Sequence, residues 1–167
     1  MVLLSKLTLL KHYISYILCR GVAFSNLNKM NFKISEFVIG DSLLPKKVAD
    51  KILLYHLLPL QKVRDEIGIP VYPSQNSCYR PVSWEKARGR SGNSQHTFKG
   101  MGACDVTCSN FQMYKDKLLE LIIKHTSYTR MAVYQGFIHC DYKPTSDGKR
   151  QLFESDKNSR WEFIKNV

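Results

Sequence analysis

The chain has no internal repeat, no low-complexity tract and no uninterrupted apolar run long enough to cross a membrane. Its composition is also far from that of a disordered protein, with 44% hydrophobic and 23% charged residues in 167 positions. A chain of this length and composition can bury one hydrophobic core. We therefore expect a single compact globular domain after the first 29 residues.

Acidic residues are missing from those first 29 positions, where apolar pairs alternate with single basic residues. A secretory signal peptide needs an unbroken apolar core, and here Lys11 and His12 interrupt the run. The same interruption argues against a membrane span. We expect residues 1–29 to be a leader, as a weak export or membrane-surface segment, or an upstream extension from a wrong start codon. The domain then occupies residues 30–167.

Acidic residues are few throughout, with 14 Asp and Glu against 25 Lys and Arg, and the formal net charge is +11. Such a charge favours polyanionic partners, among them nucleic acid, anionic lipid and the acidic polymers of a bacterial cell wall. The basic residues are scattered singly and in pairs, without the interleaved aromatic residues typical of a nucleic-acid groove. We do not expect a nucleic-acid partner, and a DNA-binding protein, with its steep salt dependence, is the weakest interpretation.

Apolar residues recur at helical spacing in two segments after residue 30. The first is 48–63, in which Pro59 should kink the helix or split it in two, and Gly68 should end it. The second is 110–126. The residues expected on its buried face are Phe111, Tyr114, Leu118, Leu121 and Ile122.

Strand signals dominate the rest of the chain. β-Branched and aromatic residues in 131–135 and 137–142, around Gly136, indicate two strands or one bent strand pair. Shorter extended segments are expected at 69–74, 150–155 and 159–164. The pattern predicts an α+β fold, with two or three helices packed on one mainly antiparallel sheet.

The stretch SGNSQHTFKGMGACDVTC, residues 91–108, places His96 and Asp105 in a segment too glycine-rich for a helix and too polar for a core. Imidazole and carboxylate are both zinc ligands, and a catalytic zinc takes three protein ligands with the fourth position left for water. His139 is the best third candidate, because apolar neighbours place its strand in the core while the histidine can face a cleft. The alternative is a packed or surface histidine, as we expect for His56 and His125.

Five cysteines, an odd number, argue against a complete disulfide framework. Cys104 precedes Asp105, and Cys140 follows His139. Successive side chains of a strand point to opposite faces, so both thiols should point away from a metal held by their neighbours. We expect structural roles for both cysteines, with thiolate ligation as the alternative.

Five short motifs follow one another along the chain: SEF at 35–37, VAD at 48–50, SCYRP at 77–81, NSQHTFKGMGACD at 93–105 and FIHCD at 137–141. In this order they resemble the zinc D-Ala-D-Ala carboxypeptidase and L,D-peptidase family of cell-wall enzymes, the M15 peptidases. The similarity is best to the small single-domain branch common in bacteriophages and bacteria. It covers about residues 32–161 and implies a fold like that of hedgehog and the DD-peptidases, with zinc as cofactor.

The zinc ligands that the resemblance implies are His96, Asp105 and His139. It also implies that Arg80 orients the substrate and stabilises the developing oxyanion. Ser94 and Gln95 match residues that shape the cleft beside the first ligand, and the alternative is that they are turn residues bonding local backbone. Eight residues separate His96 from Asp105, more than the family usually has, and a glycine-rich loop can absorb the excess.

The catalytic base is the second departure from the family, because many members carry an acid three positions before the last histidine, where this chain has Gly136. Positioned proton transfer contributes about two to four orders of magnitude to rate, so another group must substitute or activity falls. Asp141, on the same strand face as His139, is the candidate, as a base or as a partner that fixes a ligand. Further candidates are Glu154 and Asp156.

We expect a zinc-dependent peptidase that hydrolyses an amide bond in the stem peptide or cross-bridge of peptidoglycan, as a carboxypeptidase or an endolysin-type endopeptidase. Its setting is a phage lysis or entry protein acting on the host wall, or a bacterial periplasmic or extracellular enzyme. We expect a monomer whose partner is the peptidoglycan peptide. The alternative is a catalytically weak or inactive wall-binding or virion structural module, which Gly136 favours and the three retained ligands disfavour.

Overall fold

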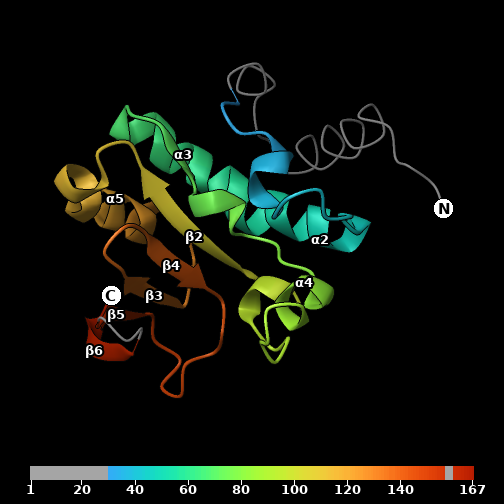
Figure 1. Cartoon of the computed structure of the whole chain (residues 1–167). Coiled ribbons are helices and arrows are strands. Elements are labelled where there is room, and N and C mark those ends of the chain that lie inside the picture. Colours follow the sequence, from blue (N-terminus) through green and yellow to red (C-terminus); the bar gives the residue numbers. More distant parts are fainter. Residues whose placement is uncertain (1–29, 157–159) are drawn as a thin grey trace. The chain divides into compact units, whose positions relative to one another are not determined.

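Six strands form one sheet in the order β1-β2-β4-β3-β5-β6 (Figure 1). They are β1 (Val71–Pro73), β2 (Ala103–Cys108), β3 (Arg130–Val133), β4 (Ile138–Asp141), β5 (Gln151–Ser155) and β6 (Trp161–Asn166). Every neighbouring pair is antiparallel except β3 and β5, which are parallel. This computed structural model describes residues 30–156 and 160–167, so the expected leader lies outside the described residues.

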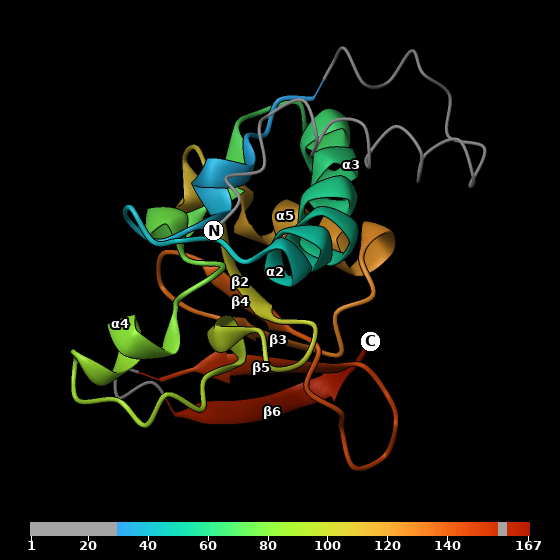
Figure 2. The same ribbon diagram turned by 90° about the vertical axis from the view of Figure 1, so that its right-hand side faces the viewer.

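The longer helices are α2 (Lys46–Lys51), η3 (Ile52–Leu57), α3 (Leu58–Ile67), α4 (Val82–Lys86) and α5 (Phe111–His125). Single turns lie at η2 (Ile34–Phe37), η4 (Ser74–Asn76) and η5 (Gln95–Thr97). Figure 2 shows α2, α3 and α5 gathered above β2 and β4, with α4 apart from them. These helices and the mainly antiparallel sheet confirm the expected α+β class. Within the described residues, no helix combines the length and apolarity that a bilayer span requires.

The first long helix stays helical from residue 46 to residue 67, so Pro59 does not split it. The turn before Pro59, η3, is instead a wider π-helical one. Proline has no N–H to offer the carbonyl four residues earlier, that of Tyr55. The Tyr142 hydroxyl donates to this carbonyl at 2.7 Å. A side chain from just beyond β4 therefore satisfies the acceptor that the proline leaves open.

Replacement of Tyr142 by Phe is expected to lower the free energy of unfolding by about 1–3 kcal/mol, because the Tyr55 carbonyl loses its donor in a partly buried position. Equilibrium urea denaturation measures this difference. Tyr72→Phe is the matched control, since this side chain is 39% exposed on β1. A Tyr142→Phe protein as stable as the parent would mean that water replaces the tyrosine hydroxyl.

The second expected helix and the expected strand pair are confirmed. Helix α5 buries Phe111, Leu118, Leu121 and Ile122, while Tyr114 is only half-buried. Strands β3 and β4 pair directly on either side of the turn that contains Gly136. The periodicity of the sequence predicts these elements because each one is long or strongly apolar and its partner is adjacent in the chain.

The register between β2 and β4 positions the candidate site. Asp105 lies opposite His139, and Cys104 lies opposite Cys140 in the adjacent pair. Side chains alternate between faces along a strand, so the histidine and the aspartate share one face and the two cysteines share the other. Both thiols are fully buried, as their expected structural roles require. Strands β2 and β4 are interior strands with neighbours on both sides, so the candidate site does not lie at an open edge of the sheet.

Candidate metal centre

Three side chains from separate elements converge on the face of the sheet opposite Cys104 and Cys140. His96 comes from η5, Asp105 from β2 and His139 from β4, and one potential ligand atom of each lies within 4.8 Å of the others. Asp105 Oδ1 is 2.7 Å from His139 Nδ1 and 3.4 Å from His96 Nε2. The structure thus brings together all three residues that the sequence suggested as metal ligands.

The second nitrogen of each histidine is held by the protein. His96 Nδ1 is 3.0 Å from the carbonyl oxygen of Cys78, to which it donates, and this leaves Nε2 as the unprotonated nitrogen. His139 Nε2 is 3.2 Å from Asp141 Oδ2. Such outer hydrogen bonds fix the tautomer and the orientation of ligating histidines. His96 Nε2 and His139 Nδ1 are therefore the nitrogens that face Asp105 Oδ1.

The outer oxygen of Asp105 is held in the same way. Asp105 Oδ2 accepts hydrogen bonds from Ser77 Oγ at 2.6 Å and from Arg80 Nη2 at 2.7 Å. Two donors on one oxygen leave the other oxygen, Oδ1, for the two histidines. All the outer atoms of the three-residue cluster are thus engaged, and the inner atoms converge on one position.

The loop that presents His96 depends on small residues. The Ser94 side chain accepts a hydrogen bond from the His96 N–H at 3.3 Å and caps η5, as a turn residue would. The backbone of Gly102 has φ +97, and a Cβ there would overlap the Phe98 ring. Glycine at position 102 therefore allows the backbone of this loop to approach the Phe98 ring. Gln95 is half-buried in the same turn, and its contact with a substrate stays a prediction.

Asp105 and His139 shift each other's pKa values. Burial raises the pKa of Asp105, but the hydrogen bond from His139 outweighs burial and holds this pKa far below its usual value. Burial lowers the pKa of His139, while hydrogen bonds and charges from Asp105 and Asp141 raise it to about 9. These contacts favour the imidazolium form of His139. A metal must displace the proton on Nδ1, so metal binding releases it.

Asp141 is fully buried behind His139. Arg130 donates to both of its carboxylate oxygens, to Oδ1 from Nε at 3.0 Å and to Oδ2 from Nη2. The Lys143 N–H also donates to Oδ1, at 2.9 Å. Burial raises the pKa of Asp141, but the hydrogen bonds from His139 and Arg130 lower it to about 2. These contacts favour the role of fixing a ligand over that of a base.

Arg80 lies beside the cluster, with its guanidinium directed at Asp105, Ser77 and Glu85. The Arg80 side chain is 15% exposed. Its Nη1 is 3.5 Å from Glu85 Oε1, which is also 3.3 Å from Arg90 Nη1. The structure therefore places Arg80 next to the candidate metal position, while its contact with a substrate stays a prediction.

Glu85 is a buried acid beside Arg80 that the sequence did not indicate. Its side chain on α4 is only 2% exposed, and within the described part of the chain its Oε2 has no hydrogen-bond partner. In the sequence, Glu85 is the only acidic residue of the basic segment WEKARGR, residues 84–90, and it follows Arg80 by five positions. This pattern alone does not predict burial, because a lone acid in a basic segment is usually solvated.

Glu154 and Asp156, the further candidates for a catalytic base, lie away from the three-residue cluster. Glu154 is exposed and pairs with Val133, whereas Phe153 pairs with Ala132, the neighbour of His139 on the candidate metal face. Glu154 therefore lies on the opposite face. Asp156 accepts from the Arg160 N–H at 2.7 Å in the connection to β6. The backbone carbonyl of Gly136 accepts from Thr107 Oγ1 at 2.8 Å.

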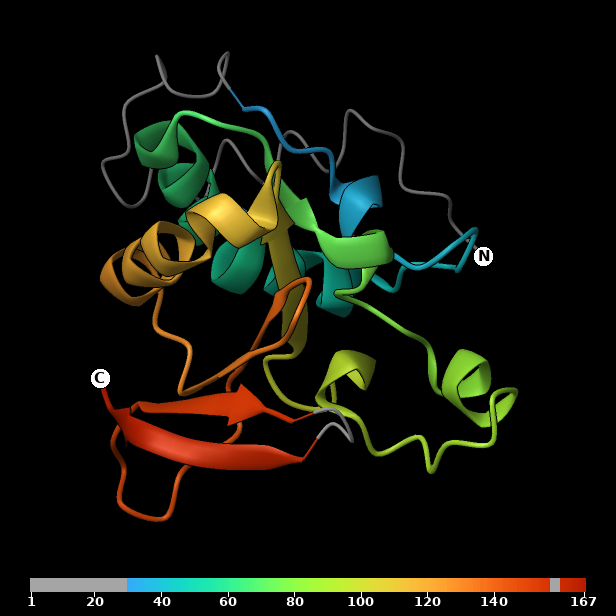
Figure 3. The ribbon, with the colours of Figure 1, turned by 60° about the vertical axis from the view of Figure 1, so that its left-hand side comes forward.

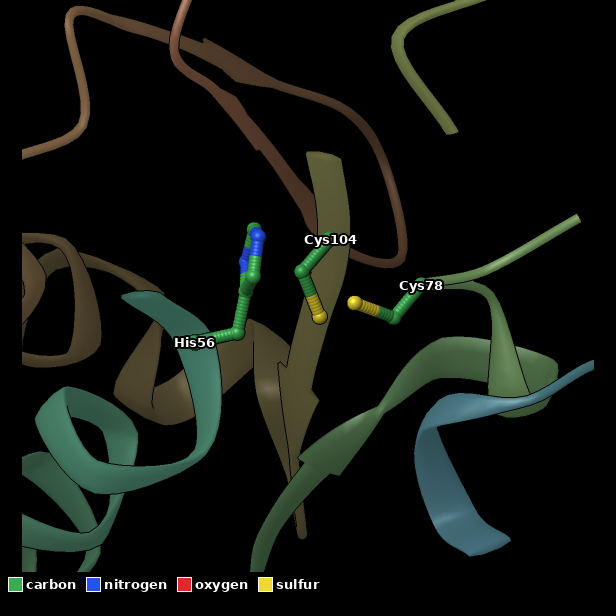
Figure 4. Close-up of side chains that lie close together, drawn as sticks. All are labelled: His56, Cys78 and Cys104. Atoms are coloured by element: carbon green, nitrogen blue, oxygen red, sulfur yellow. The ribbon is translucent and has the colours of Figure 1, made fainter. Parts of the chain in front are cut away.

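A second group of potential ligands, His56, Cys78 and Cys104, lies on the other face of β2 (Figure 4). All three are fully buried. His56 Nε2 is 3.0 Å from the Met101 carbonyl, to which it donates, and Nδ1 accepts from the Tyr128 hydroxyl at 2.9 Å. Burial raises the pKa of the Cys78 thiol well above its usual value. Both imidazole nitrogens are engaged, which favours a core role for this group.

His56 makes the folded protein sensitive to acid. Burial lowers its pKa to about 4, so between pH 6.5 and 4 the unfolded chain binds a proton that the folded chain excludes. The free energy of unfolding should therefore fall by roughly 3 kcal/mol as the pH drops across this interval. Urea denaturation at several pH values measures the slope, which His56→Gln is expected to reduce. An equal slope in parent and variant would assign the acid sensitivity to other groups.

The donor set of the candidate centre, two imidazole nitrogens and one carboxylate oxygen, is one that zinc accepts, and three protein ligands leave a fourth position open. His96, Asp105 and His139 thus fit a catalytic zinc site. No family model, curated protein or solved structure matches the chain.

Proposed function

We propose that the chain is a zinc-dependent peptidase that hydrolyses an amide bond in the stem peptide or cross-bridge of peptidoglycan. The observation that carries this proposal is the convergence of His96 Nε2, Asp105 Oδ1 and His139 Nδ1, with every outer polar atom held by the protein. The ordered motifs that resemble the M15 peptidases support it. The net charge of +11 suits an anionic cell wall.

A bound zinc ion would supply Lewis acidity, which polarises the scissile carbonyl and lowers the pKa of a water molecule. The chain's own residues position the reacting groups. Asp141 accepts a hydrogen bond from the Nε2–H of His139 and so keeps Nδ1 directed at the ligand position. We assign to Arg80, which is held by Asp105 and Glu85, the role of supplying the positive charge that stabilises the developing oxyanion.

Hydrolysis also needs a group that takes a proton from the attacking water and returns one to the leaving amine. With glycine at position 136, we assign this role to Glu85, which is buried between Arg80 and Arg90. Its Oε2 accepts the water proton as the new C–O bond forms. The same proton passes to the leaving nitrogen as the C–N bond breaks.

A second candidate function is a wall-binding or virion structural module that keeps the metal site without turnover. The observation that favours it is Gly136, which leaves the turn between β3 and β4 without an acid beside His139. In such a module Glu85 would serve only to balance the charges of Arg80 and Arg90.

Digestion of purified peptidoglycan separates the two functions. The zinc-loaded protein and a chelated control are incubated with the polymer, and newly released peptide ends are identified by mass spectrometry. New ends that disappear with chelator support the peptidase and name the bond. Intact peptidoglycan at full zinc occupancy contradicts the peptidase and supports the binding module.

A further inference from the structure

Trp84 on helix α4 lies close to three guanidinium groups, which come from the segments on either side of the helix. The Cζ atom of Arg88 lies 3.8 Å from the centroid of the Trp84 ring. Arg90 and Arg80 lie over the same ring at 5.5 and 5.7 Å. A cation that stacks on tryptophan at the Arg88 distance is held in place by the ring quadrupole.

The three arginines differ in their acidic partners. Glu85 contacts Arg80 and Arg90. The guanidinium of Arg88 makes no hydrogen bond or ion pair with any residue that the structure describes, and its side chain is exposed. Neighbouring Lys86 is exposed and equally unpaired within the described residues. The patch therefore carries net positive charge at Arg88.

Stacking on Trp84 leaves the hydrogen-bond donors of Arg88 free to bind an oxyanion. A guanidinium that lies on an indole has one face covered, while its five N–H donors point outward in its own plane. This edge matches the two oxygens of a carboxylate, and a side chain already fixed by stacking loses less conformational freedom when the ligand binds. Trp84 therefore pre-organises Arg88 for carboxylate binding.

The Arg88 site adjoins the candidate metal centre. Trp84 contacts Arg80, and Arg80 Nη2 is 2.7 Å from Asp105 Oδ2. Figure 3 shows α4 beside the loop that carries η5, the turn to which His96 belongs. Trp84 and Arg80 therefore link Arg88 to the carboxylate of the candidate metal centre.

We propose that Trp84 and Arg88 form a subsite that binds a free carboxylate of the substrate next to the metal centre. The identity of the substrate as a peptidoglycan peptide rests on the proposed function, whereas the subsite rests on the arrangement of α4. Phosphate offers similar oxyanion chemistry, and the test separates it from carboxylate.

Isothermal titration calorimetry tests the subsite by comparing N-acetyl-D-alanyl-D-alanine with its C-terminal amide and with inorganic phosphate, on full-length protein with and without zinc. The carboxylate is expected to bind about tenfold to a hundredfold more tightly than the amide, as a charged hydrogen bond contributes. Arg88→Ala should abolish this preference, and Arg88→Lys should restore only part of it, because lysine lacks the planar fork.

Lys62→Gln is the matched control, since it removes one exposed positive charge from α3 and should leave the preference unchanged. An equal loss in this control would overturn the subsite in favour of general charge attraction. Binding of phosphate alone that depends on Arg88 would overturn the carboxylate assignment.

The two proposals can fail separately. Equal binding of acid and amide by a protein that cleaves peptidoglycan would overturn the subsite and leave the peptidase standing. A preference that depends on Arg88, in a protein that cleaves nothing, would support the subsite and contradict the peptidase.

Discussion

Replacement of His139 by alanine is expected to remove stoichiometric zinc and to lower the release of peptide ends from peptidoglycan by more than about a thousandfold. His139 supplies one of three converging ligand atoms, and its ring links Asp105 to Asp141. Without it, the two remaining ligands cannot hold zinc in an ordered site. Metal analysis of dialysed protein and the peptidoglycan assay measure the two losses.

His125→Ala provides the matched control for this experiment. His125 lies at the end of α5, where its Nε2 is 2.6 Å from Glu66 Oε2, outside the candidate metal centre. This variant is expected to keep both zinc and activity. A His139→Ala protein that retains one zinc ion per chain would place the metal elsewhere, with the group of His56, Cys78 and Cys104 as the next site to test.

Replacement of Glu85 by glutamine is expected to lower peptide hydrolysis by roughly two to four orders of magnitude while zinc content stays unchanged. Glutamine keeps the size of the side chain and an oxygen for Arg80 and Arg90, but its amide cannot take a proton from water. The comparison of turnover with zinc content in the same preparation measures this split.

Glu154→Gln is the control for the assignment of Glu85. Because Glu154 is exposed on the face opposite His139, its replacement is expected to leave turnover and zinc content unchanged. Full activity in the Glu85→Gln protein would contradict Glu85 as proton acceptor and return the role to another acid, with Asp141 the first to examine.

Helix α4 supplies two different functions in this interpretation. Glu85 faces Arg80 in a nearly solvent-free position, while Trp84, the preceding residue, carries Arg88 on its ring. Neighbouring residues of a helix point in different directions, so Glu85 can face Arg80 while Trp84 holds Arg88, which follows the helix. The two variants should therefore separate, with Glu85→Gln lowering turnover and Arg88→Ala weakening binding.

The sequence by itself determined the elements and the chemistry of the candidate ligands. Amphipathic periodicity located the helix at 110–126, and β-branched residues located the strand pair around Gly136. These signals are local, since they depend on which residues alternate within one segment. Motif order then singled out His96, Asp105 and His139, which the structure places together.

Only the tertiary structure decided where these side chains lie and what holds them. The pairing of Asp105 with His139 depends on the register between strands that are distant in the chain, and a shift of one residue would pair a cysteine with His139 or with Asp105 instead. Local patterns do not encode register, nor which distant hydroxyl satisfies the carbonyl that Pro59 leaves free. For the same reason local patterns do not predict the position of Glu85, which depends on the contacts of Arg80 with both Glu85 and Asp105 in the folded chain.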